Sequence, residues 1–407
     1  MWIAILMGLR NIRRRLSRTL LTVSMLAFGT LMLVFVIGLN EGTYKDMIRM
    51  STTTWNGQFQ VLNQDYNDSP SLYESVENSD KIMEQLRAVS GVKAVTARVE
   101  TAGLFSVDNR TAGGQLTGVI PEHEKEVASL VGTISEGSFL GKTKDPEALP
   151  IVLGDGLAKR LKVKLHGEVV FMGQGADGST AAELYEVVGL IDSGIHEMDA
   201  SMAFIRLSDA QELLVLGDKV HRIVGRVESE RVLSGLDAKV DLPEGDVLQT
   251  WEQIMPEVSR GIEQDREGSV VILYIILFMV VLGIVNTLMM SVYERTREFG
   301  VMKALGTPGW QIILVVICEG AWLAILGVGL GTLLGTLLIL SLQDVGLQML
   351  DQPVEFAGMQ ILKIYPANTM LGNVTYPVII AVSSVLGSIW PAWRASRLDP
   401  ITALREF

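Results

Sequence analysis

Four long apolar runs constrain the fold of this 407-residue chain more than any other feature of its sequence. They cover residues 19–40, 269–291, 312–340 and 376–393. An α-helix needs about 20 apolar residues to cross about 30 Å of hydrocarbon, because each residue adds about 1.5 Å. The runs therefore predict a membrane protein with four transmembrane α-helices. The fourth run is the least regular, since it contains Pro377 and ends at Pro391.

Basic residues beside the runs predict the orientation of the chain. The three clusters are Arg10, Arg13, Arg14, Arg15 and Arg18; Arg295, Arg297 and Lys303; and Arg394, Arg397 and Arg405. Basic residues near span ends stay on the cytoplasmic side, so all three clusters predict a multi-pass protein with both termini cytoplasmic. These segments are basic although the net charge is −12. That asymmetry suits anionic lipid and argues against nucleic acid as a partner.

The first run follows an Arg-rich segment, as the apolar part of a signal peptide does. It is longer than the usual signal-peptide run and is not closed by a clear cleavage site. We therefore expect the run to be retained as a span, within a first segment of residues 1–40.

Residues 41–268 predict a large α+β extracytoplasmic domain between spans one and two. Alternating segments predict strands at 57–63, 92–99, 150–153, 168–172, 184–191, 202–205 and 221–227. Helices are expected from Ser79, acting as the N-cap, to about residue 89, and at 154–161 and 208–216. Residues 252–267 predict a helix that continues into span two. The other connections are a cytoplasmic helix within 292–311, an extracytoplasmic loop at 342–375 and a cytoplasmic tail at 394–407.

The sequence carries no recognisable catalytic or metal site, so we expect a protein that is not itself an enzyme. Residues 137–143 (GSFLGKT) resemble a phosphate-binding loop but have three residues between the glycines, where the motif needs four. The four histidines, His123, His166, His196 and His221, lie far apart and are expected at the surface or at helix caps. The only cysteine, Cys318, lies inside the third run, which excludes an intramolecular disulfide.

The third run contains small and ionisable residues that need an explanation inside a membrane. Gly327, Gly331 and Gly335 recur one helical turn apart and predict a face that another helix can approach closely. The neighbouring helix could belong to the same chain or to a second subunit. Glu319 should face protein, water or an interface, because a charge that faces lipid costs on the order of 2–3 kcal/mol. Asn286, in the second run, is expected to form an interhelical hydrogen bond.

Residues 294–306 (ERTREFGVMKALG) form a charged, helix-compatible segment between spans two and three. Phe299, Met302 and Leu305 follow i, i+3, i+6 spacing, and Glu294 and Arg297 can pair at i, i+3. Such a helix offers a surface to a cytoplasmic partner that supplies energy. The alternative is an interfacial helix that rests on lipid headgroups.

With these residues in view, the chain resembles the FtsX/MacB/Lol class of ABC transporter permeases over essentially its whole length. The resemblance rests on the Arg-rich residues 8–15, on residues 152–163 of the predicted domain, on residues 294–306 and on residues 391–405. It implies a place in the bacterial inner membrane and two permease subunits bound to two cytoplasmic ATPase subunits. ATP and magnesium would lie in the ATPase, and no cofactor would lie in this chain. It also implies a coupling helix formed by Glu294, Arg297, Glu298, Phe299, Met302, Lys303 and Leu305.

Within the class, residues 38–42, 57–63 and 250–251 resemble the lipoprotein-releasing permeases. That resemblance implies a lipoprotein or amphipathic substrate, a second permease copy or a sister permease, and a periplasmic carrier or adaptor. ATP-driven motion would pass through the spans to the outer domain. Two alternatives remain: a MacB-like exporter of peptides, toxins or small molecules, and an FtsX-like signal relay to a cell-wall hydrolase.

Overall fold

The structure is a computed structural model that describes residues 16–67, 71–348, 354–356, 359–361 and 363–399. The predicted basic residues Arg10, Arg13, Arg14, Arg15 and Arg405 lie outside the described residues. The chain divides into two compact units. We call Met1–Asp46, Gly261–Asp351 and Lys363–Phe407 the helical unit, and Met47–Arg260 with Gln352–Leu362 the inter-span domain.

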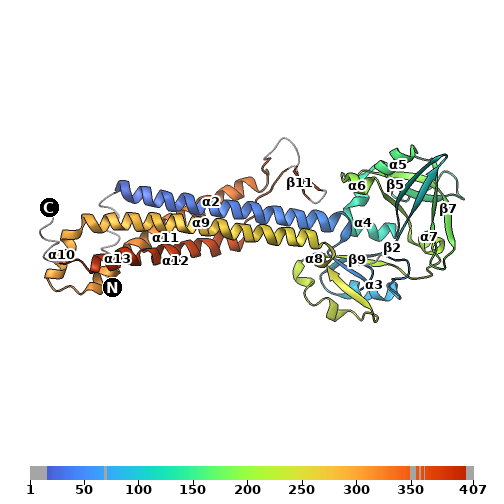
Figure 1. Cartoon of the computed structure of the whole chain (residues 1–407). Helices are drawn as coiled ribbons and strands as arrows, with labels where there is room; N and C mark the ends of the chain where they lie inside the picture. Colours follow the sequence, from blue (N-terminus) through green and yellow to red (C-terminus); the bar gives the residue numbers. More distant parts are fainter. Residues whose placement is uncertain (1–15, 68–70, 349–353, 357–358, 362, 400–407) are drawn as a thin grey trace. The chain divides into compact units, whose positions relative to one another are not determined.

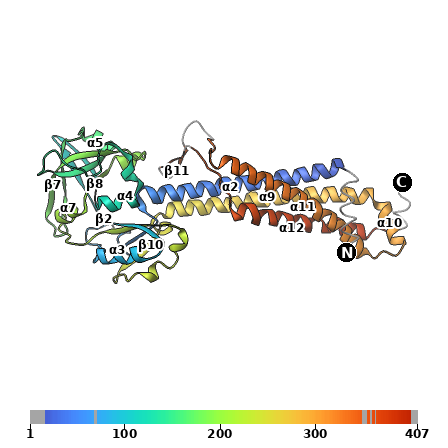
Figure 2. The ribbon, with the colours of Figure 1, turned by 180° about the vertical axis from the view of Figure 1, so that it is seen from behind.

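The helical unit contains the predicted spans. Its long elements are α2 (Leu16–Ser51), α9 (Pro256–Glu294), α11 (Gly309–Leu342) and a composite of η5 (Leu371–Thr375), α12 (Tyr376–Gly387) and α13 (Ile389–Ser396). Within the described residues these four elements are long and apolar enough to cross a membrane, and each contains one predicted run, so the four-span prediction is confirmed. Both views show α2, α9, α11 and α12 side by side (Figures 1 and 2). The short helix α10 (Thr296–Ala304) connects α9 to α11.

The prolines of the fourth span lie where helices tolerate them. Pro377 is in the first turn of α12 and Pro391 is in the first turn of α13, where backbone N–H groups have no helical partner. The two helices meet at Ser388, which is buried. A Cβ added to Gly320 of α11 would lie 2.8 Å from the Ser388 Cβ. The break in the fourth span therefore packs directly on a glycine of the third.

Glycines also bring α11 against α2. Cβ atoms added to Gly327, Gly331 and Gly335 would lie 2.5, 2.4 and 3.0 Å from atoms of α2. Of the two neighbours that the sequence left open for these glycines, the structure shows a helix of the same chain. A second subunit would have to meet other faces of α11.

Two glycines of α2, Gly38 and Gly42, leave room for the backbone of the segment before the fourth span. A Cβ added to Gly42 would lie 1.9 Å from the Tyr365 carbonyl oxygen. The N–H of Ala367 donates to the Gly38 carbonyl at 2.8 Å. The chain ahead of span four thus lies directly on span one.

The inter-span domain is built on one mixed ten-stranded sheet of order β10-β1-β9-β2-β3-β8-β5-β7-β4, with β6 paired to β2 and β7. The strands are β1 (Phe59–Asn63), β2 (Val92–Val107), β3 (Arg110–Val119), β4 (Ile134–Gly137), β5 (Leu149–Gly154), β6 (Glu168–Gln174), β7 (Thr180–Ile191), β8 (Met202–Arg206), β9 (Arg222–Val227) and β10 (Asp246–Thr250). The helices are α3 (Ser79–Ala88), α4 (Pro121–Val127), α5 (Asp155–Leu161), α6 (His196–Asp199), α7 (Leu207–Leu213) and α8 (Trp251–Ile254). Buried side chains of the sheet and of α3, α5 and α7 form the main core.

The predicted α+β domain between spans one and two is confirmed, with corrections in detail. The predicted strands and helices overlap observed elements, but the sequence missed β3, β4 and β10 and the helices α4 and α6. Ser79 is the first residue of α3 and not its N-cap, which is Asn78 in a left-handed conformation without a side-chain cap. A separate hairpin of β11 (Val354–Phe356) and β12 (Met359–Ile361) lies in the predicted loop before span four.

Span two begins at Pro256, not in the preceding helix. The predicted continuous helix at 252–267 is interrupted at Met255, between α8 and α9. A residue before proline is disfavoured in the α conformation, and Met255 adopts φ −125° and ψ 66°. From Pro256 onward α9 is unbroken to Glu294, so α9, like α2, begins in one unit and ends in the other.

Candidate functional site

The short helix α10 is defined by local contacts at both ends. Thr296, its first residue, donates its hydroxyl to two carbonyl groups in the last turn of α9. Arg295, between α9 and α10, is not helical, with φ −111° and ψ 15°. Gly306 has φ +88°, a conformation that favours glycine, and its N–H donates to the Lys303 carbonyl at 2.9 Å. The chain therefore turns before and after α10.

One face of α10 is anchored to the fourth span. Phe299 is 0% exposed and packs with the apolar residues of the helical core. The Lys303 ammonium donates to the carbonyls of Ser396, at 2.9 Å, and Leu398, at 2.7 Å. These carbonyls lie at and just beyond the end of α13, where a cation is favourable. Movement of α10 would consequently pull on α13.

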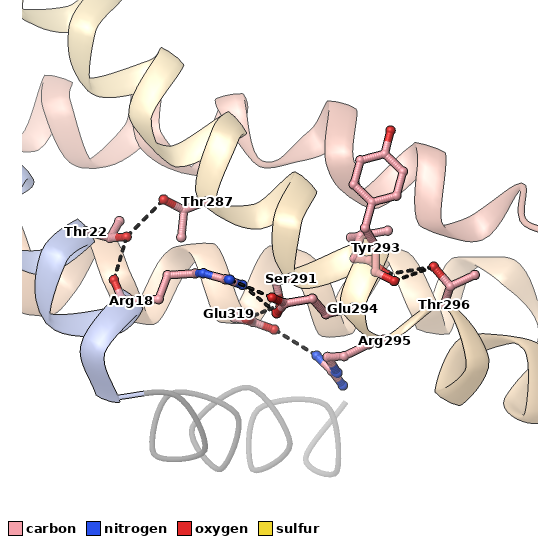
Figure 3. A network of polar contacts seen from close by, with 10 residues as sticks. Arg18, Thr22, Thr287, Ser291, Tyr293, Glu294, Arg295, Thr296 and Glu319 are labelled. Carbon is pink, nitrogen blue, oxygen red and sulfur yellow. Dashed lines mark hydrogen bonds and ion pairs between the residues drawn. The ribbon is translucent and has the colours of Figure 1, made fainter. Parts of the chain in front are cut away.

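Arg295 joins α10 to the second and third spans (Figure 3). Its Nη1 donates to Glu319 Oε2 at 3.1 Å, and its Nε donates to Glu298 Oε2 at 2.9 Å. The Ser291 hydroxyl donates to the other oxygen of Glu319 at 3.0 Å. Glu319 is buried. The structure thus directs this membrane carboxylate toward protein, as expected, because pairing offsets the cost of a charge at that depth.

A second polar group links α2 to α9 (Figure 3). Arg18 donates two hydrogen bonds to the Glu294 carboxylate, each 2.6 Å long. The hydroxyls of Thr22 and Thr287 lie 3.0 Å apart. Asn40 donates to the Ser269 hydroxyl at 3.0 Å, nearer the opposite ends of the same two helices. Polar contacts therefore hold α2 and α9 together at both ends of their shared length.

The opposite face of α10 is exposed, and its residue Glu298 also accepts the hydrogen bond from Arg295. Arg297, Glu298, Val301, Ala304 and Leu305 form this exposed stripe, and Leu305 is 83% exposed. A stripe that mixes apolar and charged side chains on a fixed helix suits insertion into a groove of another protein. The geometry therefore presents one docking surface on a helix that is attached to three spans.

The structure divides the predicted coupling residues between the two faces of α10. Arg297, Glu298 and Leu305 belong to the exposed stripe. Phe299 is buried, Met302 is half-buried, and Lys303 is bonded to the end of the fourth span. Phe299, Met302 and Leu305 do not share one face, because six residues advance a helix by about 600°, well short of two full turns.

The predicted ion pair between Glu294 and Arg297 is wrong. The pair at i, i+3 spacing is Arg295 with Glu298, and Glu294 bonds Arg18 of α2. The sequence analysis missed Val301 and Ala304 as members of the stripe. Their i+4 and i+7 spacing from Arg297 could have revealed them.

Asn286 does not fulfil its expected role in the described part of the chain. Its side chain is exposed, and its amide forms no hydrogen bond with a described residue. The neighbouring Thr287 makes the interhelical contact instead. The two residues are adjacent, so their side chains point about 100° apart around α9.

The described residues contain no cluster of three His, Cys, Asp or Glu side chains able to hold a metal ion. His166 contacts Glu186 at 2.6 Å and lowers the pKa of that carboxyl. His221 is not a surface or cap residue: it is fully buried, stacks on Tyr66 and accepts the Glu100 N–H at 2.8 Å. Burial lowers the pKa of the His221 imidazole.

Two protein families together account for nearly all of these elements. The MacB-like periplasmic core domain matches residues 19–241, and the FtsX-like permease C-terminal domain matches residues 270–400. The first match covers span one and most of the inter-span domain. The second covers the other three spans together with α10.

Named relatives are similar over most of the chain. The lipoprotein-releasing system transmembrane protein LolC of Neisseria meningitidis is 22% identical, over 98% of this chain and 98% of its own length. LolE of Haemophilus influenzae, named for the same system, is 24% identical over 79% of this chain and 77% of its own length. The macrolide export ATP-binding/permease protein MacB of Bdellovibrio bacteriovorus is 25% identical over 78% of this chain but only 48% of its own length.

Proposed function

The chain belongs to the family of MacB-like and FtsX-like ABC transporter permeases, and from that premise we propose that a separate cytoplasmic ATPase acts through it to release lipoproteins from the membrane. ATP and magnesium would be bound by the ATPase. This chain would supply the spans and the extracytoplasmic domain. It would pair with a second copy or with a sister permease.

The observation that carries this proposal is the exposed stripe of α10. Arg295, the residue just before α10, binds Glu319 of α11, and Lys303 on the opposite face of α10 binds a carbonyl at the end of α13. A protein that binds the stripe could therefore displace three spans together. This arrangement favours docking of the ATPase over an interfacial helix, because the exposed side of α10 carries charged Arg297 and Glu298 as well as the apolar Leu305.

Basic residues at the same end of the bundle support a cytoplasmic location for α10. Arg18, Arg295, Arg297, Lys303 and Arg394 all lie in or next to the helix ends there. Basic residues near span ends stay in the cytoplasm. The inter-span domain would then lie outside, where the substrate is lifted and passed to a periplasmic carrier or adaptor.

A lipoprotein substrate is supported by the LolC relative of the lipoprotein-releasing system, which is similar over 98% of the chain. The match covers only 48% of the MacB relative, which is named as an ATP-binding protein as well as a permease. Export through such a system remains an outcome to be tested.

The test is to purify the chain with the ATPase that co-isolates and to identify its cargo. Photo-crosslinking groups in the inter-span domain and the upper spans, followed by mass spectrometry, would capture the bound material. Diacylated or triacylated lipoproteins are the expected result. An adaptor or a cell-wall hydrolase without acylated cargo would indicate the exporter or the signal relay, and absence of any ATPase would overturn the proposal.

A further inference from the structure

Trp55 fixes the end of the first span's helix inside the inter-span domain. It lies in η1 (Thr52–Asn56), a π-helical turn that directly extends α2. Its ring meets Phe204 of β8 edge-on, with centroids 5.2 Å apart. The Arg98 guanidinium carbon lies 3.4 Å from the Trp55 ring centroid, which is close cation–π geometry.

The cation over Trp55 is itself held in the core. Arg98 is 1% exposed and donates to both carboxylate oxygens of Glu124, which is 0% exposed, at 2.5 and 3.3 Å. Removing two charges from water is costly, and well-packed apolar residues often serve stability as well as a buried ion pair does. The fixed, planar guanidinium of Arg98 gives the Trp55 ring one defined packing position, which we call its seat. Apolar side chains would not define such a position.

This seat connects Trp55 to the middle of the sheet. Arg98 belongs to β2, which pairs with β3, β6 and β9, and Glu124 belongs to α4, which packs against β2. Trp55 thus contacts a strand that pairs with three others. A displacement of the α2 end would be felt along β2.

The space next to Trp55 at the end of α2 is not fully packed. A cavity of about 460 Å³ adjoins Trp55, and its lining includes Met50, Met198 and Met255. Methionine side chains adapt readily to changes of shape. The end of α2 is therefore attached to the sheet at Trp55, beside space that can change shape.

We propose that Trp55, seated on Arg98 and Glu124, is the positioning residue through which motion of α2 reaches the sheet of the inter-span domain. The proposal rests on the proposed function, since it requires that ATP hydrolysis moves α2. Trp55 touches neither ATP nor the reacting groups. Its role is to convert a shift of the helix into a shift of β2.

The experiment compares Trp55→Leu with wild type in the full complex with its ATPase, in nanodiscs that contain a purified triacylated lipoprotein. We expect ATP hydrolysis to continue while the ATP used per lipoprotein released rises by roughly fivefold or more, the scale of typical coupling between sites. Hydrogen exchange in residues 92–107 and 121–127 should change on ATP addition in wild type but not in the variant. Trp55→Phe keeps a ring over Arg98 and should restore much of the coupling.

Phe139→Leu is the matched control. Phe139 is buried in the same cluster and lies 5.9 Å from the same Phe204 ring, but it is not part of α2 or η1. It should lower stability about as much as Trp55→Leu and leave coupling intact. Equal coupling in Trp55→Leu and wild type, or equal loss in Phe139→Leu, would overturn the inference.

The double variant Arg98→Met, Glu124→Leu covers the case in which Trp55→Leu does not fold. It should keep the thermal midpoint and still lose coupling, because the seat of Trp55 is gone; retained coupling would overturn the inference. If wild type neither binds an ATPase nor releases lipoprotein, the proposed function fails instead. The wild-type complex thus separates the two outcomes.

Discussion

At the scale of single residues, charges near the membrane are paired in ways that link elements. Arg18 binds Glu294 across two helices, and Arg295 binds Glu319 of the third span. Each pair removes the cost of a lone charge in an apolar setting. Both pairs lie where α9 ends and α10 begins, so they fix the position of that turn as well as stabilising the fold.

The Arg295–Glu319 pair should show strong coupling between its members. Glu319→Leu leaves the largely buried Arg295 without its partner on α11 and should cost about 3 kcal/mol of stability. Arg295→Leu combined with Glu319→Leu should recover most of that loss, because no charge is then stranded. Thermal unfolding of the single and double variants in one detergent would measure this, and additive losses would contradict it.

Asp246 should make the inter-span domain less stable at neutral pH. Partial burial raises the pKa of its carboxyl to about 6, well above its usual value. The folded state then holds the proton more tightly than the unfolded state, so stability falls as the pH rises from about 4 through about 6. Asp246→Asn should raise stability at pH 8 by on the order of 1 kcal/mol, after discounting for solvent screening, and have little effect at pH 4.

The control for Asp246 is Glu244→Gln, an exposed acid two residues away. It should change the thermal midpoint little at either pH. If Asp246→Asn gave the same midpoint as wild type at pH 8, the burial argument would be wrong.

The sequence indicated which buried residues need a polar partner, but it did not indicate which residues provide one. The need to satisfy Glu319 followed from its place in an apolar run. Its partner Arg295 and the pairing of Arg18 with Glu294, 276 residues away, depend on how helices pack. His221 was misassigned for the same reason, since nothing near it in the sequence indicates that Tyr66 and Glu100 surround it.

At the scale of elements, glycines set the contacts between spans. Gly331 admits the backbone of α2, and Gly42 admits the segment before span four. Lipid provides little hydrophobic drive for helix association, so close packing must hold the spans together. Glycine spacing therefore carries structural information that hydropathy does not.

Gly331→Ala should separate α2 from α11. The new Cβ would lie 2.4 Å from the Ala27 carbonyl oxygen, and such overpacking costs about 1–3 kcal/mol. Gly329→Ala is the matched control on the same helix, because a Cβ there meets nothing within 4 Å. Thermal unfolding in detergent should show a lower midpoint for Gly331→Ala alone. Equal midpoints for the two variants would refute the packing role.

The spans could be predicted because each run is long enough to decide its own structure, whereas several strands could not. β3 was missed since Gly113 and Gly114 weaken its strand pattern. In the fold, a Cβ at Gly114 would lie 2.5 Å from the Ser201 carbonyl oxygen, just before β8, the strand that pairs with β3. Gly114, which weakened the strand pattern, is therefore required for the close approach of the chain before β8.

At the scale of the whole molecule, the two units are connected through helices. Both α2 and α9 begin in one unit and end in the other. In the proposed function the helical unit binds the ATPase at α10, and the end of α2 contacts the sheet of the inter-span domain at Trp55. In the function that we propose, motion passes through these helices from the ATPase to the inter-span domain.

The central claim is that the exposed stripe of α10 receives the ATPase, and Leu305→Asp tests it most directly. The control is Val345→Asp, which places the same charge on a comparably exposed apolar residue just beyond the other end of α11. The measurement is the amount of ATPase retained by each purified variant, with ATPase activity stimulated by lipoprotein recorded in parallel. We predict that Leu305→Asp loses retention by about tenfold, which corresponds to about 1.4 kcal/mol, while Val345→Asp behaves as wild type. Normal retention and normal stimulation in Leu305→Asp would contradict the account.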